Sequence, residues 1–135
     1  MKQDLATILA ASRLRVTAPR RTVFRALQNA ATPLAIADIV RLCPGIDRVS
    51  VYRTIDTFLA IHIITSVPFG WKQRYELAAP LKPHHHHLHC IRCETITEIT
   101  SDEIETLINQ ISRTHALQAI GHTFELQGIC QNCRD

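Results

Sequence analysis

The apolar and polar residues of the first sixty positions repeat with a helical period. Apolar residues three or four positions apart predict a helix near residues 2–12, another that begins at Thr17, a short third one, and a fourth over residues 48–60. Thr17 can cap the second helix, because its hydroxyl can accept from a backbone N–H of the first turn. Pro19 falls in that turn, where its missing N–H costs little. The amino-terminal part is therefore predicted to be helical.

The pattern then changes to β-rich segments. Residues 63–67 are predicted to form one strand, residues 68–70 a turn, and residues 73–77 the returning strand. Helices followed by a two-stranded hairpin are the order of a winged helix-turn-helix domain. Prolines at positions 80 and 83 mark residues 80–83 as a hinge after this domain.

The remaining residues predict a smaller unit of strands around one helix. Thr100 and Glu103 have the spacing of a helix-capping box, and apolar residues from Ile104 onward give the next helix one apolar face. The expected order is a strand over 84–90, a strand over 95–99, a helix over 102–115 and a strand over 117–127. The predicted fold class is α+β, with a winged helix-turn-helix domain over residues 1–79 and a small α/β domain over residues 84–135.

Charge is divided unevenly between these two parts. The chain has 135 residues and a net charge of +3, but residues 1–82 carry 12 Lys/Arg and 5 Asp/Glu, whereas residues 83–135 carry 3 and 7. A basic part favours a polyanionic partner, and an acidic part that holds seven of eight histidines favours metal. No apolar run approaches the ~18 residues that a membrane-spanning helix needs, and no apolar signal segment opens the chain. A cytoplasmic location without membrane contact is expected.

Four cysteines form two Cys-x-x-Cys pairs, Cys90 with Cys93 and Cys130 with Cys133. A pair on a tight turn can direct two thiolates at one ion, and two pairs complete a tetrahedral zinc site. Disulfides and buried free thiols are the alternatives, and the expected cytoplasmic setting disfavours disulfides. Cys43 stands apart in an apolar context and is assigned to the core.

A run of histidines, His84-His85-His86-His87-Leu88-His89, precedes the first cysteine pair in a predicted strand. Because side chains alternate along a strand, His84 and His86 face one way, whereas His85, His87 and His89 face the other. Two imidazoles at i and i+2 can share an ion, so one strand can serve two metal sites. Candidates for the further ligands are Glu76, Glu98, Glu105, His62 and His122. The alternative is a solvated polar strand, and His89 and His115 are expected to be surface or packing residues.

The order of these motifs resembles the ferric uptake regulator family, a group of dimeric, metal-dependent, winged-helix repressors of bacteria. The resemblance covers almost the whole chain, and the histidine run looks most like that of zinc uptake regulators. It rests on five segments: Arg15-Val16-Thr17-Ala18-Pro19-Arg20, Ser50-Val51-Tyr52-Arg53-Thr54, Tyr75-Glu76-Leu77, the histidine run with Cys90-x-x-Cys93, and His122 with Gly128-Ile129-Cys130-x-x-Cys133.

The resemblance implies three metal sites. A structural zinc falls on the four paired cysteines of a carboxy-terminal dimerisation domain. A second site, near the dimer interface, falls on His84, His86, Glu105 and His122. A third, regulatory site at the domain junction falls on His85 and His87, with Glu76 and Glu98 as the expected carboxylates.

Several positions depart from the family pattern. Iron and peroxide sensors of the family place a histidine near position 33, where this chain has Pro33, and peroxide sensors have Asp where Glu98 stands. Some zinc regulators have an Asp after the recognition helix and a Cys after the wing, whereas Thr65 and Ala79 lie nearby here. His62 lies in the right region to replace a missing ligand. Peroxide sensing is therefore disfavoured, and Zn²⁺ is the favoured regulatory ion, with Fe²⁺ as the alternative.

The resemblance places DNA recognition on the helix over residues 48–60. Its polar side is expected to lie against phosphates and a thymine methyl group, and the arginines around the start of the second helix against phosphates or an A·T-rich minor groove. The residues expected to contact DNA are Arg15, Arg20, Ser50, Tyr52, Arg53 and Thr57. The expected partner is a double-stranded operator, an A·T-rich palindrome, that binds a homodimer.

Taken as a whole, these features predict a sequence-specific, metal-responsive repressor of metal-uptake genes. It is not expected to be an enzyme, because no nucleophile–base set or phosphate-binding loop is visible. A metal-trafficking or storage protein is an alternative that the basic amino-terminal part and the recognition helix argue against. A zinc hydrolase would need an open position for water, which a site with four protein ligands does not leave.

Overall fold

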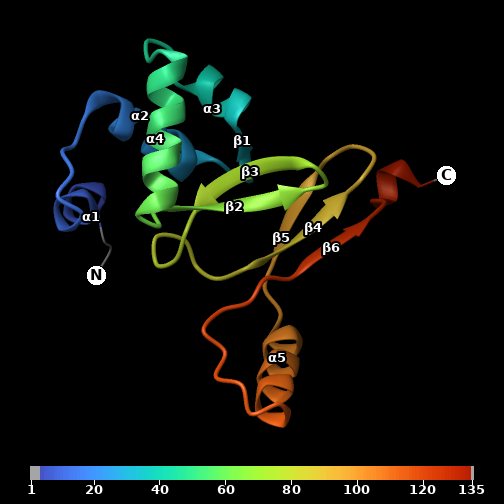
Figure 1. Ribbon diagram of the computed structural model, residues 1–135. Coiled ribbons are helices and arrows are strands. Elements are labelled where there is room, and N and C mark those ends of the chain that lie inside the picture. The colour runs from blue at the N-terminus through green and yellow to red at the C-terminus, as the bar shows by residue number, and fades with distance from the viewer. Residues whose placement is uncertain (1–3, 135) are drawn as a thin grey trace. The chain divides into compact units, whose positions relative to one another are not determined.

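A computed structural model gives the fold of residues 4–134 (Figure 1). The chain divides into two compact units, with the boundary between Pro83 and His84. The first unit contains α1 (Leu5–Ala11), α2 (Ala18–Asn29), β1 (Leu34–Ala35), α3 (Ile36–Leu42), α4 (Arg48–Ala60), β2 (Ile64–Phe69) and β3 (Lys72–Leu77). The second contains β4 (His86–Cys90), β5 (Ile96–Ile99), α5 (Asp102–Thr114), β6 (Glu125–Gly128) and the 3-10 helix η1 (Gln131–Cys133). None of the described helices is both long and apolar enough to cross a membrane.

The helices of the first unit begin at polar caps. The Thr17 hydroxyl accepts from the Arg20 N–H at 3.4 Å, which confirms the predicted cap of α2. Asp47 caps α4 in the same way, because its carboxylate accepts from the Ser50 N–H at 2.9 Å. The helix predicted near residues 2–12 spans Leu5–Ala11, and residues 1–3 lie outside the described part.

One side of each helix forms the apolar core of this unit. Leu9, Val23, Ile39 and Phe58 come from four different helices and are fully buried. Cys43 is also fully buried in this cluster, which confirms its assignment to the core. The opposite side of α4 is left for contacts outside the core.

A three-stranded sheet in the order β1-β3-β2 completes the winged-helix order of the first unit. Pro68 was predicted to lie in the turn, but it belongs to β2, an edge strand, where a missing N–H is tolerated. The turn lies at Gly70, whose φ of 58° suits glycine. Leu34 belongs to the apolar pattern that predicts the short third helix, but Leu34 and Ala35 form β1 because they pair with β3.

The second unit is built on the sheet β5-β4-β6, in which β4 is central (Figure 1). β5 pairs with it antiparallel and β6 parallel. The strand predicted over residues 117–127 is wrong for residues 117–124, which form no regular element. The pairing between β4 and β6 involves residues 87–90 of β4, so β6 has four residues.

Helix α5 begins at residue 102, as predicted, but its cap lies one residue after the predicted one. Ser101, not Thr100, is the cap: its hydroxyl accepts from the Ile104 N–H at 3.3 Å, and its extended backbone precedes the first turn. No residue of α5 is buried in the single chain. Leu107 and Ile111 of its predicted apolar face are 56% and 51% exposed, whereas Ile104 and Ile108 are half-buried, so residues 4–134 cover this face only in part.

Candidate functional site

The four paired cysteines lie together at one end of the second unit. Their sulfur atoms are all within 4.8 Å of one another, and the Cys93 and Cys130 Sγ atoms are 3.7 Å apart. Four sulfurs about 2.3 Å from a zinc ion form a tetrahedron with edges of about 3.8 Å. A disulfide would need about 2.05 Å. The cluster therefore has the donor set and the spacing of a zinc–thiolate site.

Two strand ends hold this cysteine cluster. Cys90 is buried at the end of β4, and its sulfur accepts from the Cys130 N–H at 3.3 Å, which is the main reason why its pKa falls to about 6. Hydrogen bonding with the Cys130 side chain is the main reason why the pKa of Cys133 rises to about 12. The Arg92 guanidinium donates to the Cys133 carbonyl oxygen at 2.6 Å and fixes the second pair against the first.

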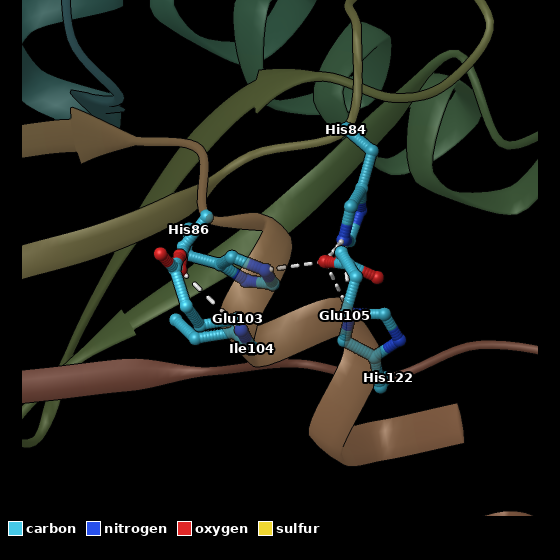
Figure 2. A network of polar contacts seen from close by, with 7 residues as sticks. His84, His86, Glu103, Ile104, Glu105 and His122 are labelled. Atoms are coloured by element: carbon cyan, nitrogen blue, oxygen red, sulfur yellow. Dashed lines mark hydrogen bonds and ion pairs between the residues drawn. The ribbon is translucent and has the colours of Figure 1, made fainter. Parts of the chain in front are cut away.

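A second cluster surrounds the carboxylate of Glu105 on α5. Figure 2 shows the rings of His84, His86 and His122 directed at this carboxylate. A single oxygen, Glu105 Oε1, lies 3.0, 2.8 and 3.2 Å from the Nε2 atoms of these three histidines in that order. The Nε2 atoms of His84 and His122 are 2.9 Å apart. Three imidazoles and one oxygen that converge on a point are the ligand arrangement of a metal site.

Burial differs across this histidine–glutamate cluster. The His86 side chain is 1% exposed and the His84 side chain is 49% exposed, so the cluster is closed on the sheet side and open on the other. The hydrogen bond with His86 is the largest influence that lowers the pKa of Glu105. A carboxylate that stays ionised is a better ligand for a cation.

The other face of β4 carries a third group. His85 and His87 approach each other with Nε2 atoms 3.1 Å apart, and the His85 Nε2 atom is 3.8 Å from a Glu98 carboxylate oxygen. Glu98 reaches this face because it lies opposite His87 in the antiparallel β4–β5 pair. The alternation predicted for the histidine run thus separates two groups of possible ligands.

Two expected ligands belong to the first unit. Glu76 lies on β3, and its buried carboxylate accepts from the Lys82 ammonium at 3.0 Å, so a charge there is stable without a metal. His62 occupies the exposed turn after α4, with a positive φ of 58°. Over residues 4–134, no cluster of three or more potential metal ligands includes His62.

The expected DNA-contacting residues gather where α2 begins beside α4. A shallow hollow of about 160 Å³ is lined by Arg20, Ser50, Arg53 and Thr57, among others. Tyr52 is 42% exposed, and Arg15 is exposed just before α2, where its carbonyl oxygen accepts from the Arg20 guanidinium at 2.6 Å.

One of these side chains already has a partner. The Ser50 hydroxyl donates to the Asp47 carboxylate at 2.6 Å, and this hydrogen bond lowers the pKa of Asp47. A phosphate contact by Ser50 would therefore require its hydroxyl to leave Asp47.

Glu125 is a residue that sequence reasoning did not find. Its carboxylate contacts both His87 and His89, so the three side chains form one cluster. His89 was expected to be a surface or packing residue, and it is a buried member of this cluster. The missing information was the parallel register that sets Glu125 opposite His87.

Comparisons with known proteins agree on one family. The model of the Ferric uptake regulator family matches residues 11–127. The ferric uptake regulation protein of Yersinia pestis is 32% identical over 130 residues, which cover 90% of this chain and 86% of that protein. The Helicobacter pylori ferric uptake regulator, described as having three functional metal binding sites, has a TM-score of 0.84 at 25% identity, covering 99% of this chain and 96% of that one. A zinc-bound manganese uptake regulator has a TM-score of 0.75 at 28% identity, covering 95% and 99%.

Proposed function

The chain belongs to the ferric uptake regulator family, whose members are metal-responsive transcription regulators and not enzymes, and we propose that it represses metal-uptake genes as a homodimer. It would bind operator DNA when a metal ion fills its histidine clusters. The observation that carries this proposal is the arrangement of residues 84–89, in β4 and just before it, whose alternating histidines join a separate carboxylate-containing group on each side. Such a regulator acts where its operator is, in the cytoplasm.

Several features of the first unit support DNA as the partner. Residues 1–82 carry 12 Lys/Arg against 5 Asp/Glu, and Arg20 and Arg53 line one hollow between α2 and α4. We assign residues 1–79 to DNA binding, with an A·T-rich palindrome as the operator and contacts from Arg15, Arg20, Ser50, Tyr52, Arg53 and Thr57. A palindrome matches the two-fold symmetry of a homodimer.

The exposed apolar face of α5 supports the dimer. Leu107 and Ile111 are more than half exposed in the single chain, although they lie on the apolar side of an amphipathic helix. Apolar surface of this kind is stabilised by burial against a partner. Residues 84–135 would therefore serve as the dimerisation and metal-binding domain, with residues 80–83 as the hinge.

Zinc is the metal that the ligand chemistry favours. The cysteine cluster suits a structural Zn²⁺, because four thiolates at tetrahedral spacing leave no open position. The cluster of His84, His86, Glu105 and His122 offers three imidazoles and one oxygen, which suits tetrahedral Zn²⁺. Fe²⁺ is the second candidate, since imidazole and carboxylate also bind it. The named relatives regulate iron or manganese uptake, so the choice of zinc rests on these ligands.

The group around His87 is proposed as the sensor. An ion held by His85, His87 and Glu98 would also take a ligand from the first unit, with Glu76 as the first candidate and His62 as the second. Such an ion would restrict the hinge and set the distance between the two recognition helices, which must match half-sites roughly 34–36 Å apart. Without metal, the apparent DNA affinity would equal the intrinsic affinity multiplied by the fraction of molecules in a competent orientation, and would be lower for that reason.

Paired substitutions test this assignment. The His87→Ala variant should lose metal-dependent DNA binding, measured by fluorescence anisotropy with operator DNA, while its cysteine cluster keeps zinc. The His86→Ala variant is the matched comparison, because it removes the same side chain from the opposite face of β4. If His87→Ala keeps full metal-dependent binding while His86→Ala abolishes it, the sensor is the cluster around Glu105.

A further inference from the structure

His87 lies on the central strand of the second unit's sheet, between two carboxylates. In the sheet β5-β4-β6 it pairs with Glu98 of β5 on one side and with Glu125 of β6 on the other. Directly paired residues place their side chains on the same face. The His87 ring is 5% exposed, so its surroundings are protein and not bulk solvent.

The two ring nitrogens of His87 face different groups. Its Nε2 atom is 3.1 Å from the Nε2 atom of His85, within the group that contains Glu98. Its Nδ1 atom is 3.0 Å from Oε1 of Glu125. An ionised carboxylate can only accept a hydrogen bond, so the proton of the neutral ring must sit on Nδ1. The lone pair is then on Nε2, which is the form that can bind a metal beside His85.

The carboxylates of Glu125 and Glu105 are used differently. In the Glu105 cluster one oxygen lies within 3.2 Å of three histidine nitrogens, and the His84 ring centroid is 4.7 Å from that of His86. Glu125 instead gives Oε1 to His87 and Oε2 to His89, whose ring centroids are 6.0 Å apart. The first pattern converges on a point, as metal ligands do. The second is a carboxylate that bridges two N–H donors.

We propose that Glu125 is a positioning residue that holds His87 in its metal-binding tautomer and orientation, and that His89 in turn fixes Glu125. His89 is suited to this role because its side chain is 1% exposed and its Nε2 atom contacts the second oxygen of Glu125. Histidine ligands in metal sites commonly donate their other N–H to a carboxylate, and loss of that partner costs about 10- to 100-fold in metal affinity. The inference rests on the proposed metal site at His85 and His87.

The test begins without metal at the histidines. Long-range ¹H–¹⁵N spectra of the full-length protein, with zinc at the cysteines and the histidine clusters emptied by a chelator, report which ring nitrogen carries the proton. The wild type should show His87 protonated at Nδ1, and Glu125→Ala should lose this preference. Glu103→Ala is the control, because it removes an exposed carboxylate of the same unit, one that accepts from the Ser101 hydroxyl and belongs to neither histidine cluster. A wild-type His87 protonated at Nε2 would overturn the proposal.

Metal affinity gives the second readout. In a His122→Ala background, which disables the cluster around Glu105, competition with a zinc chelator should show Glu125→Ala binding zinc about 10- to 100-fold more weakly at the remaining histidine site. Glu103→Ala should bind as the parent does. Equal affinity of the Glu125→Ala variant would refute the positioning role. If Glu125→Ala instead loses one whole zinc equivalent at saturation while the His87 site still binds zinc, Glu125 belongs to a separate metal site, and this result also refutes the positioning role.

The two proposals fail in different ways. If His87→Ala binds zinc as tightly as its parent, the metal site assigned to His85 and His87 is wrong. If His87→Ala loses that zinc but Glu125→Ala does not, the site stands and only the role of Glu125 is wrong. The tautomer measurement requires no metal at the histidines, so it tests the Glu125–His87 contact in either case.

Discussion

Replacement of Arg53 by alanine tests whether the polar side of α4 contacts DNA phosphates. Val51 and Ile55 of the opposite side are 0% and 1% exposed, whereas Arg53 is exposed and lines the hollow with Arg20. Alanine is the best helix former, so the substitution should leave the fold intact. The expected loss is therefore a loss of charge at the interface.

The magnitude follows from counterion release. Each phosphate contact contributes about 0.9 to the slope of log affinity against log salt concentration, and a homodimer carries two copies of Arg53, so the slope should become shallower by ~1.8. Over a fourfold rise in salt, roughly 50 to 200 mM, the affinity of Arg53→Ala should then fall about 12-fold less than that of the wild type. Fluorescence anisotropy of metal-saturated protein with labelled operator DNA, at several salt concentrations, measures both slopes.

Arg41→Ala is the matched control for Arg53→Ala. Arg41 lies on α3, is exposed and forms an ion pair with Asp38, and its removal changes the net charge of the protein by the same amount. Its salt slope should equal that of the wild type. An unchanged slope for Arg53→Ala, or equally reduced slopes for both variants, would refute a phosphate contact at Arg53.

Three further predictions concern the second unit. Cys90→Ser should unfold or monomerise this unit, because zinc binding at the cysteines is part of its folding free energy. Size-exclusion chromatography and metal analysis test this, and a variant that stays dimeric and zinc-loaded would refute it. Zinc binding near pH 7.5 should release at least one proton per cysteine cluster. The raised pKa of Cys133, about 12, keeps its thiol protonated without metal, whereas Cys90, with a pKa of about 6, is already a thiolate. Calorimetry in buffers of different ionisation enthalpy measures this release, and a value of zero protons contradicts the prediction. Ser101→Ala should lower the free energy of unfolding by ~1 kcal/mol in thermal or urea unfolding through loss of the α5 cap, whereas Thr100→Ala should not, and equal effects would contradict the assignment of the cap.

The sequence predicted those elements whose signals are local. Helix α4 has the predicted bounds, because its apolar residues recur at a helical spacing over three turns. The two histidine groups could be predicted because side-chain direction alternates along any strand, whatever its neighbours are. The common site of the four cysteines could likewise be predicted from local signals, the two Cys-x-x-Cys spacings.

Features that depend on partners distant in the sequence were not predictable. β1 is a strand only because Leu34 and Ala35 pair with β3, about 40 residues later. The role of Glu125 depends on the parallel register between β4 and β6, which no local pattern encodes. The cap of α5 was predicted at Thr100 and lies at Ser101 for a local reason. Both residue types can cap a helix, and the extended backbone that a cap needs is found at Ser101.

The most direct test of the account is the DNA affinity of the protein against buffered free zinc, with the cysteine cluster kept loaded throughout. The account predicts tight operator binding when the histidine clusters are filled, and weak binding when a chelator empties them while one zinc per chain remains at the cysteines. Fluorescence anisotropy and metal analysis of the same samples give both quantities. Equally tight operator binding by protein that holds zinc only at its cysteines would contradict the claim that metal at the histidines controls DNA binding.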